Sequence, residues 1–128
     1  MLSERYDISP ILKCLYDVAD GIGEKTYTSA RPKAVTPRMN DFTVVSVAAR
    51  LAGNESYGTA VGRISLYIRR GEQGMENVAR ASQMQRAVYS KLPLNDGRYI
   101  LGRPSTYPMG DDGNGFMVYH IQFSIIVI

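Results

Sequence analysis

The chain has 128 residues, of which 45% are hydrophobic, with one cysteine, one histidine and a formal net charge of +3. This length and composition are typical of a single globular domain, residues 1–128, with one core. One cysteine excludes an internal disulfide and a thiolate zinc site. No apolar run approaches the roughly 20 residues of a membrane helix, so we expect a protein made in the cytoplasm without a membrane partner.

The positive charge is concentrated in the middle of the chain, where residues 42–92 carry seven basic and three acidic side chains. Such a bias favours an acidic partner or a nucleic-acid backbone. The longest basic run is only Arg69-Arg70, which is typical of a solvated face. The tyrosines are not clustered with basic residues, so we expect no sequence-specific binding of nucleic acid.

The first predicted element is a helix over residues 10–22, which Ser9 caps. Residues 24–41 contain two prolines and indicate an extended, irregular connection with one short strand near 26–30. Cys14 borders the apolar stripe of the helix as a small semi-buried hydrophobe. That stripe has helical spacing and consists of Ile11, Leu15, Val18, Ala19 and Ile22.

A long β-hairpin is predicted next, with strands at 42–51 and 59–70 and a turn at 52–58. Its second strand alternates Ile64, Leu66 and Ile68 with polar residues, so one face meets a core and the other meets water or a partner. The first strand has valines on both faces, which indicates that its second face is covered as well. These valines are Val44, Val45 and Val47.

The second half of the chain predicts a helix over 75–92, a short strand over 98–102 and a last strand over 116–128, with an irregular loop at 103–115. The helix gathers apolar residues on one face, namely Val78, Ala81, Val88, Tyr89 and Leu92. The fold class that follows is α+β, a mainly antiparallel sheet with two amphipathic helices packed on one face.

The glycine-rich stretch Gly110–Gly115 contains two aspartates and invites comparison with ion and phosphate loops. Neither register of a helix-loop-helix calcium site supplies ligands at the first and twelfth positions. A phosphate loop lies between a strand and a helix and carries a lysine, whereas this stretch precedes a strand. We therefore interpret it as a turn.

His120 lies in the middle of the last strand, on its polar face. Neither His120 nor Cys14 is accompanied by a recognisable catalytic set. We therefore expect no catalytic residues, no cofactor site, no metal site and no enzymatic activity.

The order of these elements, the hairpin with its basic end Tyr67-Ile-Arg-Arg70, the following helix and the closing strand resemble the tail terminator and tail completion proteins of long-tailed bacteriophages. The resemblance implies a structural virion protein that forms a ring, commonly a hexamer, at the junction of tail and neck. Its partners would be copies of itself and other tail or neck proteins. The segments 24–41 and 103–115 have no counterpart in that pattern.

An oligomer contact is predicted on the hairpin, because tyrosine and arginine are favoured at interfaces and the extra valines need cover. The expected contact residues are Val45, Val47, Arg63, Tyr67, Arg69 and Arg70. The alternative is a small-ligand-binding or enzymatic domain with a pocket between sheet and helices, near His120.

Overall fold

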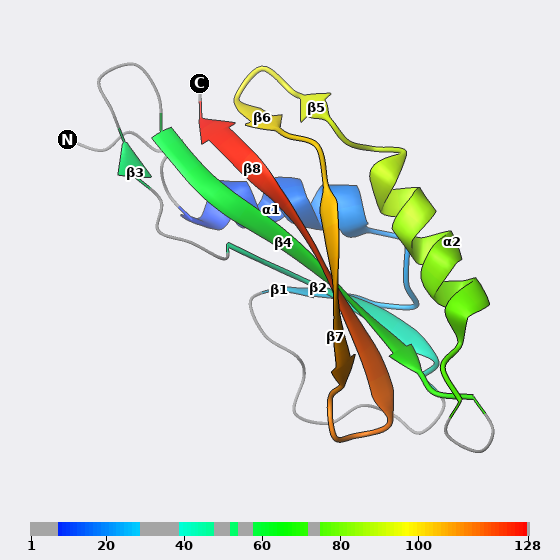
Figure 1. The fold of residues 1–128 in the computed structure, drawn as a ribbon. Helices are drawn as coiled ribbons and strands as arrows, with labels where there is room; N and C mark the ends of the chain where they lie inside the picture. The colour runs from blue at the N-terminus through cyan, green and yellow to red at the C-terminus, as the bar shows by residue number, and fades with distance from the viewer. Residues whose placement is uncertain (1–7, 29–38, 48–51, 54–57, 72–74, 128) are drawn as a thin grey trace.

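The structure is a computed structural model that describes residues 8–28, 39–47, 52–53, 58–71 and 75–127 (Figure 1). Two helices and eight strands lie in these ranges. The helices are α1 (Ile8–Ala19) and α2 (Val78–Tyr89). The strands are β1 (Thr26–Thr28), β2 (Asp41–Val47), β3 (Ala52–Gly53), β4 (Gly58–Arg69), β5 (Leu94–Asn95), β6 (Tyr99–Leu101), β7 (Ser105–Asp111) and β8 (Phe116–Val127).

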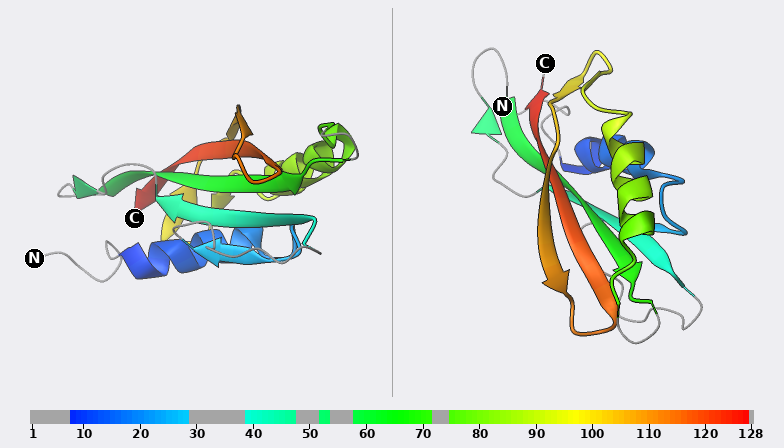
Figure 2. Two further views of the ribbon diagram at one scale, coloured as in Figure 1. Left: turned by 90° about the horizontal axis from the view of Figure 1, so that it is seen from below. Right: turned by 45° about the vertical axis from the view of Figure 1, so that its right-hand side comes forward.

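The strands form one sheet in the order β1-β2-β4-β8-β6-β5. β3 pairs with the start of β4 on the same side as β2, and β7 pairs with β8 next to β6 along the same edge. Among the described pairs, β1 and β2 are parallel and all others are antiparallel. The sheet is strongly twisted, and β1 and β7 lie at its opposite edges (Figure 2). This confirms the predicted α+β class.

Both helices pack on the same face of the sheet, which we call the helix-covered face. The alternation of β4 and β8 places their large apolar side chains there, as predicted for both strands. Gly62 of β4 is required on this face, because a Cβ atom at this position would lie 2.7 Å from the Phe123 ring. The sheet side chains buried with the helices include Val45, Ile64, Leu66, Ile121, Phe123, Ile125 and Val127.

The opposite face, which we call the outer face, carries a second apolar cluster near one end of the sheet. Met39, Phe42, Val44 and Phe116 form it, with Tyr27 and Tyr67 packed against them. β2 therefore contributes to a core on both of its faces. The prediction that its second face is covered is confirmed.

The apolar stripe of α2 differs from the predicted one. Ala81, Met84 and Val88 are its buried residues, whereas Val78, expected in the stripe, is 62% exposed. The helix begins at Val78, after its cap Asn77. The Val78 side chain is exposed at the end of the helix and is not part of the core. Met84 fills the core position that the sequence pattern had not assigned to it.

The segment 103–115 was predicted as an irregular loop, and that prediction is wrong for its larger part, because β7 pairs with β8 over Ser105–Asp111. Proline is disfavoured in a central strand. Within the described residues, however, β7 pairs only with β8, and it has a bulge next to Pro108. An edge strand tolerates the missing N–H there. The predicted features at 29–38, 48–51 and 54–57 lie outside the described residues.

A buried ion pair connects α2 to the rest of the fold. The Asp41 carboxylate, only 4% exposed, accepts hydrogen bonds from Arg80 Nε at 2.9 Å and Nη2 at 3.3 Å. Arg80 Nη2 also donates to the Ile22 carbonyl at 3.0 Å, and Asp41 accepts from the Glu24 backbone N–H at 2.9 Å. One aspartate and one arginine thus join β2, α2 and the turn that follows α1.

We expect Arg80→Ala to lower the free energy of unfolding by about 2 kcal/mol, because it leaves the buried Asp41 carboxylate without its cation. Lys13→Ala is the matched control, since it removes a cation from the exposed Lys13–Asp17 pair. Exposed pairs of this kind contribute at most about 0.5 kcal/mol. Urea unfolding of both variants measures the difference, and equal losses would contradict the structural role assigned to Arg80.

Candidate functional site

The structure places Val45 and Val47 on the helix-covered face, in register with Ile64 and Gly62 of β4. Val45 is fully buried in the main core, and Val47 packs against that core. This corrects the expected contact surface, because the helices of the same chain provide the cover that these valines were predicted to find in a partner. Two of the six expected contact residues are thus part of the core.

Tyr67 lies on the outer face, as the alternation of β4 predicts, but its ring is part of the second apolar cluster. It stacks on Phe42 with the ring centroids 4.6 Å apart and the planes 9° from parallel. Phe42 is fully buried, so the tyrosine covers one of the largest side chains of the cluster. Its ring therefore stabilises the fold of the chain.

The three arginines of the expected contact surface also interact within the chain. Arg69 donates from Nε to the Met39 carbonyl at 2.8 Å, and its guanidinium lies 4.7 Å from the centre of the Phe116 ring. Arg70 forms an ion pair with Asp111 of β7. With the Gln122 amide oriented to accept, Arg63 Nε and Nη2 lie 3.2 Å and 2.8 Å from its oxygen. These contacts stabilise the monomer and do not by themselves indicate a partner surface.

The stretch Gly110–Gly115 begins with the last two residues of β7, and its remaining residues connect β7 to β8, so the predicted turn is confirmed for 112–115. Gly110, Gly113 and Gly115 all have positive φ, between 84° and 89°, where other residues are strained. Asp111 Oδ1 accepts from the Gly113 N–H at 2.6 Å, and Asp112 Oδ1 accepts from the Asn114 N–H at 2.7 Å. The hydrogen bond from the Gly113 N–H is the main cause that lowers the pKa of the Asp111 carboxyl, and the nearby Arg70 lowers this pKa further. The two aspartates thus order the turn.

His120 and Cys14 lie on opposite sides of the sheet and do not form a catalytic pair. His120 is on the outer face, across from Ser65 on β4 and Tyr107 on β7. Cys14 is on α1, and its thiol donates to Asp96 Oδ2 at 3.6 Å. Burial, with the charge of Asp96, raises the pKa of the Cys14 thiol to about 12, so it stays protonated near neutral pH. Among the described residues, no three His, Cys, Asp or Glu side chains converge in a way that could hold a metal.

His120 should make stability fall as the pH drops below its usual pKa of 6.5. Burial and the nearby Arg63 charge lower its pKa in the folded state below the usual 6.5. The unfolded chain then takes up a proton first on acidification, so the free energy of unfolding falls as the pH drops below 6.5. We expect His120→Gln to lose less stability than the wild type between pH 7.5 and pH 5 in urea titrations. Parallel pH profiles of the two proteins would refute this role.

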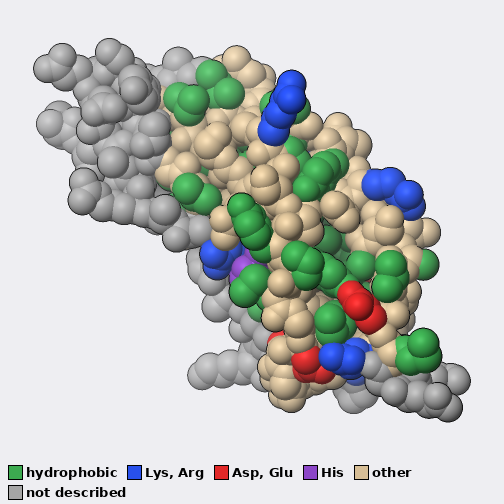
Figure 3. Space-filling model, viewed as in Figure 1, with side chains coloured by type: hydrophobic (Ala, Val, Ile, Leu, Met, Phe, Trp, Pro, Cys, Tyr) green, Lys and Arg blue, Asp and Glu red, His purple; other side chains and the backbone are tan. Residues whose placement is uncertain are grey.

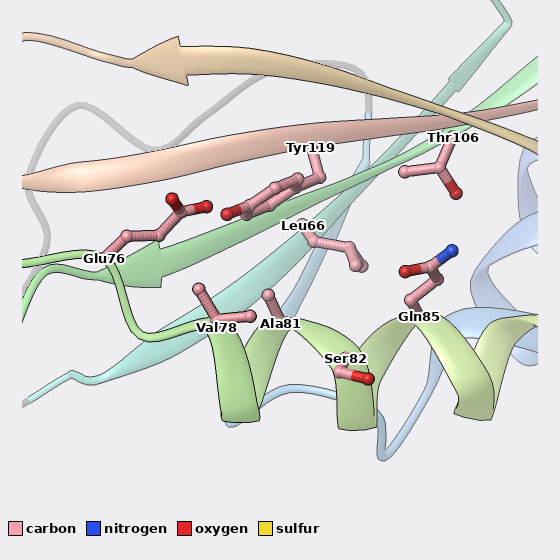
Figure 4. A pocket seen from close by; sticks show the side chains of 8 residues that line it. All are labelled: Leu66, Glu76, Val78, Ala81, Ser82, Gln85, Thr106 and Tyr119. Carbon is pink, nitrogen blue, oxygen red and sulfur yellow. The ribbon is translucent and has the colours of Figure 1, made fainter.

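A groove on the helix-covered face separates α2 from the sheet (Figure 4). Its floor is apolar, with Leu66 from β4, Ala81 from α2 and Tyr119 from β8, and its volume is about 240 Å³. The rim is formed by Glu76, Val78, Ser82, Gln85 and Thr106. Tyr89 and Thr106, whose hydroxyl oxygens are 2.7 Å apart, join α2 to β7 at one end of the groove. A pocket between sheet and helices was the alternative expectation, but the residues of this groove were not predicted, because β7 was not predicted.

Large apolar side chains are exposed at and just before the start of α2 and on β7. Val78, the first residue of α2, is 62% exposed, Met75, three residues before it, is 68% exposed, and Met109 on β7 is 55% exposed. Figure 3 shows hydrophobic side chains gathered over β7 and between β7 and α2. We call Met75, Val78 and Met109 the α2–β7 patch. His120 is on the outer face, so the expectation that a pocket between sheet and helices lies near His120 is wrong.

Comparison with known proteins supports the fold. No protein-family model matches the chain, and no curated protein matches it. One solved structure, whose name states no function, superposes with a TM-score of 0.66 over 100% of this chain and 97% of that chain, at 15% sequence identity. At this identity the likeness shows the fold alone. Within the part of the chain that the structure describes, no helix is long and apolar enough to cross a membrane.

Proposed function

We propose that this chain is a structural protein of a bacteriophage virion that assembles into a homo-oligomeric ring, commonly a hexamer, at the junction of tail and neck. The role is the one implied by the resemblance of its sequence pattern to tail terminator and tail completion proteins. The α2–β7 patch is the observation that carries the proposal. Other tail or neck proteins are the further partners, and the mature location is the virion.

The patch supports assembly because side chains of this kind are usually buried. Met75, Val78 and Met109 are each more than half exposed, and Val78 lines a groove whose floor is also apolar. Exposed apolar patches on single chains mark surfaces that bind another molecule. Burying each of these side chains would contribute on the order of 1 to 2 kcal/mol to such a contact.

A small-ligand site is the second candidate, and the groove is the observation that favours it. Its volume of about 240 Å³ lies below the roughly 300 Å³ at which ligand pockets begin. Its lining carries one carboxylate, Glu76, and no basic side chain or histidine. Recognition of an anionic ligand therefore has no cationic partner there, Glu76 is the single carboxylate that could transfer a proton, and the assembly role is better supported.

Multi-angle light scattering behind size exclusion tests the proposed function. We expect the purified chain to elute as one species with a mass several times that of a single chain. A closed ring adds no further subunits, so this mass should stay constant over at least a tenfold range of concentration. A mass equal to one chain at every concentration up to about 10 mg/ml would refute the proposal.

A further inference from the structure

The chain contains one asparagine that is followed by glycine, and it lies in the turn between β7 and β8. This pair is Asn114-Gly115, and both residues are exposed. The other four asparagines precede aspartate, glutamate or valine. An asparagine before glycine is chemically labile, because glycine has no side chain to hinder attack by its own nitrogen on the preceding amide. The sequence therefore makes Asn114 the most reactive side-chain amide of the chain.

The structure leaves both reacting groups of this pair free. Among the described residues, neither the Asn114 side-chain amide nor the Gly115 N–H forms a hydrogen bond. The turn is held instead by the Asn114 N–H, which donates to Asp112 Oδ1 at 2.7 Å, and by the Gly115 carbonyl, which accepts from the Arg70 N–H at 2.9 Å. The amide and the nitrogen that would react are therefore not needed to form the turn.

An asparagine in the other exposed turn shows the opposite arrangement. Asn95, at the end of β5, is exposed like Asn114. The nitrogen that follows it, in Asp96, donates to the Tyr99 carbonyl at 3.2 Å, and Asn95 Oδ1 accepts from the Gly97 N–H at 2.9 Å. This nitrogen has to lose its hydrogen bond before it can attack the amide. Asn95 is thus a matched internal control for Asn114.

We propose that Asn114 is a site of spontaneous deamidation, with solvent water as the co-reactant. The Gly115 backbone nitrogen gives up its proton and forms a bond to Asn114 Cγ, the Cγ–Nδ2 bond breaks, and Nδ2 leaves as ammonia with that proton. The product is a cyclic succinimide. Water then opens the ring at either of its carbonyl carbons, which gives an aspartate or an isoaspartate at position 114. This inference goes beyond the proposed assembly and does not depend on it.

The modification changes both the charge and the length of the turn. The new carboxylate joins Asp111 and Asp112, and Arg70 is already paired with Asp111. Isoaspartate also adds one methylene to the main chain before Gly115, which displaces its carbonyl from the Arg70 N–H. We therefore expect a lower melting temperature for the isoaspartyl form than for Asn114→Asp, which adds the charge alone.

Peptide mapping by mass spectrometry tests the proposal on the folded protein. The protein is incubated at neutral and at mildly alkaline pH, and the peptides that contain Asn114 and Asn95 are followed over time. We expect Asn114 to deamidate at least about tenfold faster than Asn95, which corresponds to a barrier lower by about 1.4 kcal/mol or more. The Asn114 rate should rise with pH, because the attacking nitrogen has to lose its proton. Labelling with an isoaspartate methyltransferase identifies the isoaspartyl product.

The control variant is Asn114→Gln, which keeps an amide at this exposed position but would have to close a larger ring, so its peptide should stay unmodified. A second arm repeats the incubation in guanidinium, where unfolding frees every backbone nitrogen. Unfolding should accelerate Asn95 and change the Asn114 rate by less than about tenfold, because the folded turn already leaves Asn114 and Gly115 free. Equal rates at Asn114 and Asn95 in the folded protein, or a larger rise at Asn114 on unfolding, would overturn the proposal.

Discussion

The ion pair between Asp41 and Arg80 is the constraint on which the arrangement of the two helices depends. Asp41 is the first residue of β2, and its side chain lies on the helix-covered face, almost without exposure. A carboxylate there is costly unless it is neutralised and fully hydrogen bonded. Arg80 and the Glu24 backbone N–H satisfy that need, and Arg80 also binds the carbonyl of Ile22. The carboxylate therefore holds α2 and the turn after α1 on one side of the sheet.

This placement of α2 leaves a groove and an apolar patch beside it. α2 buries Ala81, Met84 and Val88 in the core, so its neighbouring row, which begins at Val78, lies over the gap to β7. The helix therefore has a buried side and a second side along the groove, which carries the exposed Val78 together with the polar Ser82 and Gln85. In the proposed assembly, the first side belongs to the fold and the second to the contact with the next copy.

On the outer face, residue types that are common at interfaces make contacts within the chain. Within the chain, Tyr67 stacks on Phe42, and Arg69 forms a cation–π contact with Phe116. Arginine and tyrosine are enriched at interfaces because they combine apolar area with hydrogen bonding, and the same properties suit a small secondary core. Residue type alone therefore did not distinguish an intermolecular contact from an intramolecular one on this strand.

The sequence predicted the elements whose pattern is local and regular. Apolar and polar residues alternate along β4 and β8, which have twelve residues each. This period of two predicted which side chains share a face of the sheet and that the sheet is mainly antiparallel. β7 did not follow, because Pro108 weakens a strand pattern unless the strand is known to be at an edge, and that depends on the whole topology. The same holds for Val45 and Val47, since one-strand periodicity shows that a face is apolar and not what covers it. The groove combines α2, β4, β7 and β8, so it exists only in the folded chain.

The central claim is that identical chains assemble into a closed ring through a contact that includes the α2–β7 patch. Electron cryomicroscopy of the purified protein tests it most directly, because class averages show both closure and the orientation of each copy. The account predicts rings with one rotational axis in which α2 and β7 of each copy lie in the contact with a neighbour. Monomers, two-fold dimers or rings joined through the outer face of the sheet would contradict it.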